Sequence, residues 1–306
     1  MYDVVIVGGG PGGLSALIWC HRLGLHAILL ERSDELGGQL RGINNPIIDY
    51  LGIPAPNGKE LQKRFLSHVK EAGSLYECGV EVRELRLHEK RLITEDSEYR
   101  AKAFILALGS RDRRLEIPGE SEMIARNEVY SASRDKEKFS GKNVAVIGGG
   151  DRAAEGALLL AENGANVILI HRNERFRARK EFLDPVLKHP RINVQTNSVV
   201  QKIVGKQCVE SIVANTQGTL QEIPVDAVFV RIGVAPNSDL LKGQVQLDED
   251  GYVRVNEVGE TSVRNIFAVG DLCTRPLFSS IAGSAAQGMA AAKTISCRLE
   301  AGEVAE

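Results

Sequence analysis

Two long stretches of the chain share one pattern of apolar and polar positions. Each starts with a short apolar run, YDVVIVG at 2–8 and KNVAVIG at 142–148, and continues through a glycine-rich turn into a helix-like stretch. A second apolar run follows, which ends at Glu31 in the first stretch and at His171 in the second. Short apolar runs bounded by glycine turns predict buried strands, so each stretch predicts a strand–helix–strand unit. The two units form an internal repeat, with their first glycines 140 positions apart (148 − 8).

The glycines in both turns have the spacing that a bound dinucleotide requires. Gly8, Gly10 and Gly13 follow the pattern G-x-G-x-x-G between a predicted strand and a predicted helix. The first glycine permits a tight turn, the second lets a pyrophosphate approach the backbone, and the third lets helix and strand pack closely. The second turn repeats the pattern at Gly148, Gly150 and Ala153. We therefore expect two nucleotide sites, and glycine turns without a ligand are the alternative.

The residue that ends the second strand of each unit selects the nucleotide. Glu31 can accept hydrogen bonds from ribose hydroxyls and would repel a 2′-phosphate, which favours FAD or NAD at the first site. At the second site, Arg172, Arg175 and Arg177 follow His171. Guanidinium groups suit a phosphate dianion, so the second site favours NADPH. The alternative is that this basic segment is only the solvated start of a helix.

Two further stretches favour FAD over NAD at the first site. GGQL at 37–40 follows the first unit, and IFAVGDLC at 266–273 predicts a buried strand that ends in a glycine and an aspartate. Asp271 is placed to hold a polyol such as the ribityl chain of a flavin. The helix-like stretch GSAAQGMAAAKTI after it would direct a positive helix end at the flavin ring.

Charge and composition exclude several classes of partner. The 306 residues carry a formal net charge of −2 at pH 7, which gives no indication of nucleic acid or of an anionic membrane. No apolar run approaches the roughly 20 residues that span a bilayer. The chain enters its first strand directly after Met1, without a leader, so we expect a cytoplasmic protein. The six histidines show no ligand spacing beyond that of His21 and His26, which lie on a turn, and we expect no metal site.

The whole chain resembles the low-molecular-weight thioredoxin reductases, a family of flavoproteins with two dinucleotide-binding domains. The motifs that carry the resemblance are GGGPGG, GGQL, ILALGS, LEIPGE, VAVIGGG, HRNERFRA, VRIGVAPN and IFAVGD, in the family's order. The resemblance implies an α/β fold with two Rossmann-like domains, the NADPH domain being inserted into a discontinuous FAD domain. The FAD domain would take residues 1–115 and 245–306, the NADPH domain 116–244, and the protein would be a homodimer.

The resemblance also implies which residues bind the two cofactors. The residues expected to bind FAD are Gly8, Gly10, Gly13, Glu31, Arg32, Gly38, Gln39, Asp49, Gly109, Gly270, Asp271 and Ser280. The residues expected to bind NADPH are Gly148, Gly150, Asp151, Arg152, His171, Arg172 and Arg177. One arginine of the family's phosphate site is replaced by Asn173, which predicts a weaker preference for NADPH over NADH.

The redox cysteines of the resembled family are missing from this chain. In the ungapped comparison they fall on Ser131 and Arg134, whereas the family's neighbouring acid is retained as Asp135. The five cysteines of the chain lie far apart in the sequence, with no C-x-x-C motif. Dithiol–disulfide exchange needs two thiols within bonding reach, so we expect no reduction of thioredoxin by the family mechanism.

The electrons must therefore reach another acceptor, and three hypotheses remain. The first is an acidic carrier such as ferredoxin or flavodoxin, which basic residues in SRDRR at 110–114 and SRDKEKF at 133–139 would steer. Against this hypothesis, such reductases usually carry a C-terminal extension, and we expect none here because the chain stops soon after its last helix. The second is an oxidase or diaphorase that reduces oxygen, quinones or small disulfides. The third is a sensor that binds both cofactors without useful turnover.

Two residues near the expected flavin site leave alternatives open. Phe278 lies where the family has a polar side chain beside the flavin, and its ring could stack near the isoalloxazine or pack in the core. Cys273 lies two residues after Asp271 and could take part in the chemistry or be a buried structural thiol.

Overall fold

The computed structural model describes residues 1–303 and divides the chain into two compact units. Unit 1 consists of Met1–Arg111 and Ala235–Glu306, and unit 2 of Asp112–Val234. Unit 2 is thus inserted between two segments of unit 1. The predicted α/β fold with two Rossmann-like units is confirmed, because each unit contains a parallel sheet built around one of the two glycine turns.

The unit boundaries differ from the expected ones at 115/116 and 244/245. Leu115 packs against the core of unit 2, and Leu241 is fully buried in the same cluster as Val5 and Val7 of unit 1. Burial of these apolar side chains assigns residues 112–115 to unit 2 and 235–244 to unit 1. Which nucleotide each unit binds stays a prediction.

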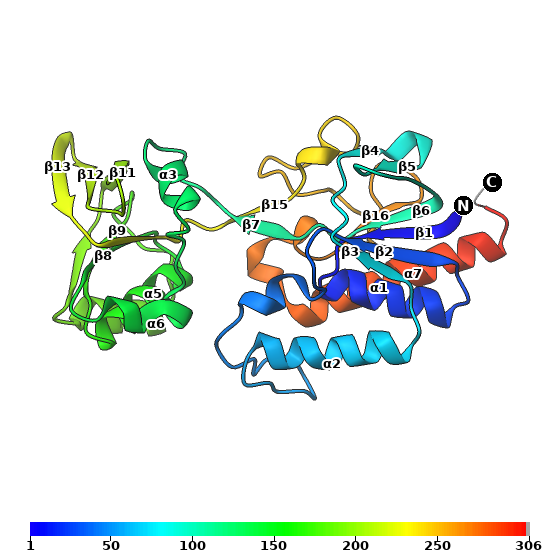
Figure 1. Ribbon diagram of the computed structural model, residues 1–306, viewed down its shortest axis with the longest axis horizontal. Coiled ribbons are helices and arrows are strands. Elements are labelled where there is room, and N and C mark those ends of the chain that lie inside the picture. The colour runs from blue at the N-terminus through cyan, green and yellow to red at the C-terminus, as the bar shows by residue number, and fades with distance from the viewer. Residues whose placement is uncertain (304–306) are drawn as a thin grey trace. The chain divides into compact units, whose positions relative to one another are not determined.

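Unit 1 is built on a sheet whose strand order is β3-β2-β1-β6-β5-β4, with β16 paired to β6. The strands β1, β2, β3, β6 and β16 are parallel, and β5 and β4 continue the sheet in antiparallel fashion. Figure 1 shows α1, α2 and α7 on one side of the parallel strands. Its elements are β1 Tyr2–Val7, α1 Pro11–Arg22, β2 Ala27–Glu31, α2 Gly58–Glu71, β3 Tyr76–Cys78, β4 Glu84–Arg86, β5 Arg91–Ile93, β6 Glu98–Leu106, β16 Ile266–Ala268 and α7 Ile281–Glu300.

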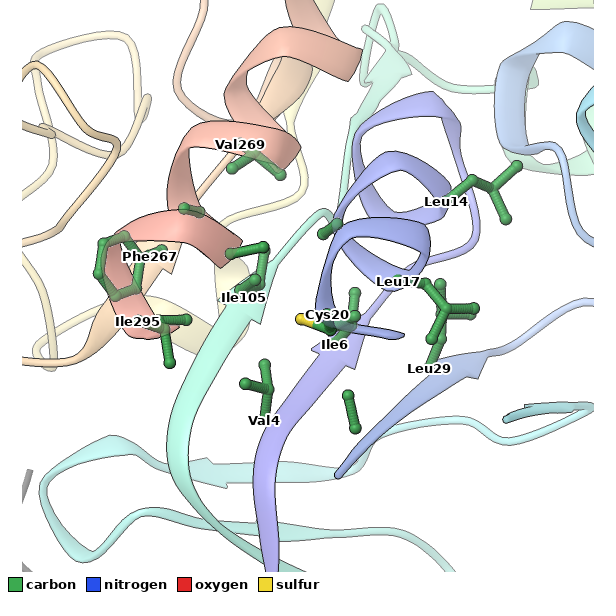
Figure 2. Close-up of a cluster of buried hydrophobic side chains, with 14 of the residues drawn as sticks. Val4, Ile6, Leu14, Leu17, Cys20, Leu29, Ile105, Phe267, Val269 and Ile295 are labelled. Atoms are coloured by element: carbon green, nitrogen blue, oxygen red, sulfur yellow. The ribbon is translucent and has the colours of Figure 1, made fainter. Parts of the chain in front are cut away.

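The central strands of unit 1 are apolar at consecutive positions because both faces of the sheet are covered. Side chains alternate between the faces of a strand, so Val4 and Ile6 pack with α1 and α7, whereas Val5 and Val7 pack on the opposite face. Figure 2 shows the first face, where the side chains of Leu14, Leu17 and Cys20 from α1 and Ile295 from α7 meet the strands. This packing fixes the strand ends at which the first glycine turn begins.

Unit 2 repeats the same plan in a sheet of strand order β10-β9-β8-β14, all parallel. Within this unit, α5 and α6 lie on one side of the sheet and an antiparallel sheet of β11, β12 and β13 lies on the other (Figure 1). Its elements are α3 Glu120–Ala125, α4 Ala132–Asp135, β8 Asn143–Ile147, α5 Asp151–Glu162, β9 Asn166–Ile170, α6 Lys180–Lys188, β10 Ile192–Gln195, β11 Ser198–Val204, β12 Ser211–Thr216, β13 Thr219–Pro224 and β14 Ala227–Val230.

The chain passes between the units through two short strands. These are β7 (Ser110–Asp112) and β15 (Val234–Pro236), which pair with each other. No helix within residues 1–303 has both the length and the apolar character that crossing a membrane requires.

Candidate functional site

A cavity of about 760 Å³ in unit 1 lies around the first glycine turn. Its size falls within the range of pockets that bind small molecules and cofactors. It collects residues from distant parts of the sequence, including the ends of β1, β2 and β6 and the segment before α7. The residues predicted for FAD that line it are Gly8, Gly10, Glu31, Arg32, Gly38, Gln39, Gly109, Gly270, Asp271 and Ser280.

Each glycine of the first turn has a different steric role. Gly8 has φ +106°, and a Cβ there would lie 2.3 Å from the carbonyl oxygen of Ala107. A Cβ on Gly13 would lie 1.9 Å from the carbonyl oxygen of Gly8, so Gly13 permits the close contact of helix and strand. A Cβ on Gly10 would meet nothing within 4 Å. The space beside Gly10 is therefore free for a ligand, which fits the backbone approach that a pyrophosphate needs.

Glu31 connects the end of β2 to the first glycine turn. The side chain is buried, and its Oε2 accepts a hydrogen bond from the backbone N–H of Gly9 at 2.6 Å. Its Oε1 accepts from the backbone N–H of Ser33 at 2.9 Å. Because a carboxylate offers more acceptor sites than these two bonds use, Glu31 retains capacity for ribose hydroxyls while it holds the turn in place.

Asp271 is the centre of a polar network on the wall of the cavity. Its Oδ2 accepts hydrogen bonds from Gln39 Nε2 at 2.9 Å and from Ser110 Oγ at 3.0 Å, and Ser279 Oγ donates to its Oδ1. Gln39 and Asp271 are among the residues predicted from the sequence to bind FAD, whereas Ser110 and Ser279 are not. Their signal in the sequence is weak, since each is a serine beside a predicted site residue (Gly109 or Ser280).

Asp49 and Phe278, both considered for the flavin site, do not line the cavity. Asp49 is exposed and is not among the residues that line the cavity. Phe278 is 74% exposed, so packing in the core is not its role. It lies directly before Ser279 and Ser280, which line the cavity.

The second glycine turn, in unit 2, repeats the geometry of the first. A Cβ on Gly148, where φ is +153°, would lie 2.1 Å from the carbonyl oxygen of Arg231, whereas a Cβ on Gly150 would meet nothing within 4 Å. Two predicted NADPH residues beside the turn already have partners. Asp151 accepts hydrogen bonds from the backbone N–H and Nε of Arg179, at 2.8 and 2.7 Å, and Arg152 pairs with Asp112 at 3.0 Å.

His171 packs directly on the second turn. Its ring fills the space where a Cβ of Gly149 would lie, and its Nε2 lies 3.1 Å from the carbonyl oxygen of Arg175. Burial lowers the pKa of His171, and the charges of Arg177 and Arg172 lower it further against the opposing hydrogen bond to Arg175. The histidine is thus neutral at pH 7 and serves to position the turn.

The basic segment after His171 is a loop and not the start of a helix, since α6 begins only at Lys180. Arg172, Arg175 and Arg177 are exposed. Within residues 1–303 their guanidinium groups make no ion pair or hydrogen bond, which leaves their donors available to a ligand in solution. The segment is therefore no helix start, and its binding of the 2′-phosphate of NADPH stays a prediction.

The segment at 131–138 is held by a network of ionic hydrogen bonds. The carboxylate of Asp135 is buried and accepts from the backbone N–H of Ser131 at 2.9 Å, from Arg134 Nε at 2.9 Å and from Lys138 Nζ at 2.9 Å. Burial alone would raise the pKa of Asp135, but these bonds outweigh it and hold the pKa well below the ordinary value. Asp135 thus ties Ser131, Arg134 and Lys138 into one fixed charge network.

Replacing Asp135 by asparagine is expected to destabilise the protein by about 1–3 kcal/mol at pH 7, since a buried charged acceptor with three donors is lost. Because the folded-state pKa is depressed, the native stabilisation is complete above the unfolded pKa of about 4 and is lost as pH falls toward the folded-state value. Urea denaturation of both proteins should therefore show a gap at pH 7 that narrows toward pH 3. The control is Asp184→Asn, which alters an exposed aspartate of α6; a gap independent of pH would contradict the assignment.

All five cysteines lie within the described residues and form no disulfide. Cys273 donates from Sγ to the carbonyl oxygen of Ala268 at 3.2 Å, and burial raises its pKa to about 11. At neutral pH Cys273 is a protonated thiol with low nucleophilicity, which favours the structural alternative.

Comparison with known proteins agrees with this architecture. A family model described as pyridine nucleotide-disulphide oxidoreductase matches residues 2–292. The thioredoxin reductase of Peptoclostridium acidaminophilum is 32% identical over 302 residues, which are 95% of each chain, and a "34.2 kDa protein in rubredoxin operon" of Clostridium pasteurianum is 32% identical over 88% of each. The crystal structure of Lactococcus lactis thioredoxin reductase in its FR conformation superposes with a TM-score of 0.84 at 32% identity, covering 96% of this chain and 98% of that one. The chain therefore belongs to the thioredoxin reductase-like family of pyridine nucleotide-disulphide oxidoreductases, whose members use FAD and NADPH.

Proposed function

We propose that this protein passes electrons from NADPH through FAD to an acceptor outside its own polypeptide, without a redox disulfide of its own. Family membership supplies the oxidoreductase class. The proposal that the protein has no redox disulfide of its own rests on residues 131–135. Ser131 and Arg134 stand where the resembled family has its cysteines, and the Asp135 network fixes them in place.

The two glycine turns support the assignment of the cofactors to the units. The cavity of unit 1, with free space beside Gly10 and the carboxylates of Glu31 and Asp271, would hold FAD. The turn at Gly148–Gly150 and the exposed arginines 172–177 of unit 2 would hold NADPH. When bound, the two cofactors supply hydride transfer from the nicotinamide to the flavin. The chain orients them, and Glu31 disfavours a 2′-phosphate at the first site.

A small acidic electron-carrier protein such as ferredoxin or flavodoxin is the acceptor that we favour. The relative from C. pasteurianum is named for a rubredoxin operon, which associates one similar protein with a small electron carrier. Exposed basic residues of this chain, among them Arg113, Arg114 and Arg134, would steer an acidic partner. A homodimer and a cytoplasmic location, both expected from the sequence, complete the proposal, and sedimentation of the purified protein tests the first.

Anaerobic reduction by NADPH tests the function directly. Addition of NADPH to the FAD-loaded protein is expected to bleach the visible flavin absorption rapidly. Ferredoxin or flavodoxin should then restore the colour quickly, whereas air should restore it slowly. Oxidised thioredoxin serves as the control acceptor and should have no effect.

Other outcomes of this experiment favour different functions. Rapid recovery with air, quinones or a small disulfide, without response to a carrier protein, would indicate an oxidase or diaphorase. Failure of NADPH to bleach the flavin would contradict both enzyme proposals and favour a sensor that binds the cofactors. Reduction of thioredoxin would contradict the proposed loss of the family mechanism.

Replacing Arg177 by alanine is expected to weaken NADPH binding roughly tenfold to hundredfold and to leave NADH binding unchanged. The guanidinium is exposed and has no ionic partner among residues 1–303, so its loss removes a charge-assisted contact without disturbing the loop. The dissociation constants of both nucleotides can be measured by calorimetry. Lys188→Ala, at the end of α6, is the matched control. Equal weakening of NADPH and NADH would place the 2′-phosphate elsewhere.

A further inference from the structure

The chain leaves the sheet of unit 1 at Gly270, directly before Asp271. The last hydrogen bond along β16 runs from the backbone N–H of Val269 to the carbonyl oxygen of Leu106, at 3.0 Å. Gly270 is buried, and its backbone N–H donates instead to Oε1 of Gln287 in α7, at 2.7 Å. Because buried backbone donors need acceptors, the position of Gly270 depends on this side chain.

The nitrogen of the Gln287 amide holds the other end of the same turn. Its Nε2 donates to Oγ1 of Thr274 at 3.0 Å. The backbone N–H of Thr274 donates to the carbonyl oxygen of Gly270, also at 3.0 Å, and this bond closes residues 270–274 into a turn. One amide thus spans the turn from its first residue to its last, and Asp271 lies between the two points that it holds.

The helix α7 is a rigid support for Gln287 because it packs closely on α1. A Cβ on Gly288 would lie 2.1 Å from the carbonyl oxygen of Gly12, so the two helices meet at their backbones. Ser15 Oγ also donates to the carbonyl oxygen of Ala285 at 2.6 Å. Close-packed contacts of this kind transmit displacements and do not absorb them. The position of Gln287 relative to the first glycine turn, from which α1 starts, is therefore fixed.

The carboxylate of Asp271 depends on the backbone that carries it. Its donors are side chains, namely those of Gln39, Ser110 and Ser279. Side chains turn about single bonds, so they can follow the carboxylate if its backbone moves. A carboxylate that binds a polyol must keep its oxygen atoms within about 2.5–3.0 Å of the hydroxyl oxygens. The turn that Gln287 fixes therefore determines whether Asp271 meets such a ligand.

We propose that Gln287 is a positioning residue for FAD, which holds the turn 270–274 so that the carboxylate of Asp271 is in place for the ribityl chain. Gln287 does not line the cavity, so it acts through Asp271 and not by contact with the cofactor. The inference rests on the proposed assignment of FAD to unit 1 and deepens it.

Titration of the apoprotein with FAD tests this role. Gln287→Met keeps the length of the side chain, removes both hydrogen bonds and is expected to weaken FAD binding about tenfold or more. Gln287→Glu keeps acceptors for Gly270 and for the hydroxyl of Thr274, and should bind FAD within about threefold of the native affinity. The matched control is Thr294→Val, which removes a hydrogen bond to Ala290 within α7 and should bind FAD like the native protein.

A double substitution distinguishes positioning from a merely structural role. Asp271→Asn and the double variant Asp271→Asn/Gln287→Met should bind FAD with the same affinity, because Gln287 has nothing to position once the carboxylate is lost. If the two losses of affinity multiply, Gln287 supports unit 1 as a whole, and the proposal is overturned.

Two further outcomes separate this inference from the assignment of the cofactor. Native FAD affinity in Gln287→Met would overturn the inference alone, whereas a native apoprotein that does not bind FAD would overturn both. Should Gln287→Met melt at a much lower temperature, Thr274→Val decides, since it removes only the bond to Nε2. A weakening of about threefold that disappears in the Asp271→Asn background supports the proposal, and no weakening overturns it.

Discussion

Replacement of Gly13 by alanine is expected to destabilise unit 1 by about 3–5 kcal/mol, which approaches the total stability of many domains. The added Cβ would lie 1.9 Å from the carbonyl oxygen of Gly8 and 3.1 Å from its carbonyl carbon. Both are backbone atoms, and Gly8 is itself held against the carbonyl oxygen of Ala107. Relief of the overlap therefore requires α1 to move away from the sheet, which opens the cluster formed by Val4, Leu14 and their neighbours.

Urea denaturation measures this loss, and a second glycine provides the control. Gly156 lies within α5, where an added Cβ would make only an ordinary contact of 3.5 Å with Ala132 Cβ. Alanine is favoured over glycine inside a helix by about 1 kcal/mol, so Gly156→Ala should be as stable as the native protein or more stable. If Gly13→Ala had the same free energy of unfolding as the native protein, the contact between helix and strand would be shown to relax.

Replacement of Gly10 by alanine is expected to weaken FAD binding at least a hundredfold while the apoprotein keeps its melting temperature. The Cβ would enter free space beside the turn, so it disturbs no protein contact. That space is where we expect the pyrophosphate of FAD to meet the backbone, and a methyl group would exclude it. The ratio of flavin to protein after purification, and titration of the apoprotein with FAD, give the result.

Gly150→Ala is the matched control in unit 2, because its Cβ would also meet nothing within 4 Å. This variant should retain FAD and lose affinity for NADPH. If Gly150→Ala lost FAD while Gly10→Ala retained it, the assignment of the two cofactors to the two units would be reversed. A lower melting temperature in either apoprotein would indicate a structural role for that glycine.

The two strand–helix–strand units could be predicted from the sequence because their signals are local. An apolar run, a glycine turn and a second apolar run determine the strands β1 and β2, and the same holds for β8 and β9. The boundaries between the two units were harder to predict from the sequence. Leu241 follows the motif VRIGVAPN, and only its burial with Val5 and Val7 shows that it belongs to unit 1.

The candidate sites show the same limit at the level of side chains. Gln39 and Asp271 were predicted separately, yet their hydrogen bond spans 232 positions of sequence, and no local pattern predicts it. Asp49, predicted from the resemblance alone, is exposed and does not line the cavity.

The pairing of β7 with β15 has a consequence for how such a chain can be assembled. The backbone N–H of Arg113 donates to the carbonyl oxygen of Gly233 at 2.9 Å, so unit 2 begins and ends at neighbouring points. Joining two distant points of a chain costs entropy that grows with the length of the loop between them. When unit 2 folds, it brings its own first and last residues together. Its 123 residues (234 − 112 + 1) therefore cost the folding of unit 1 no more closure entropy than a short hairpin turn would.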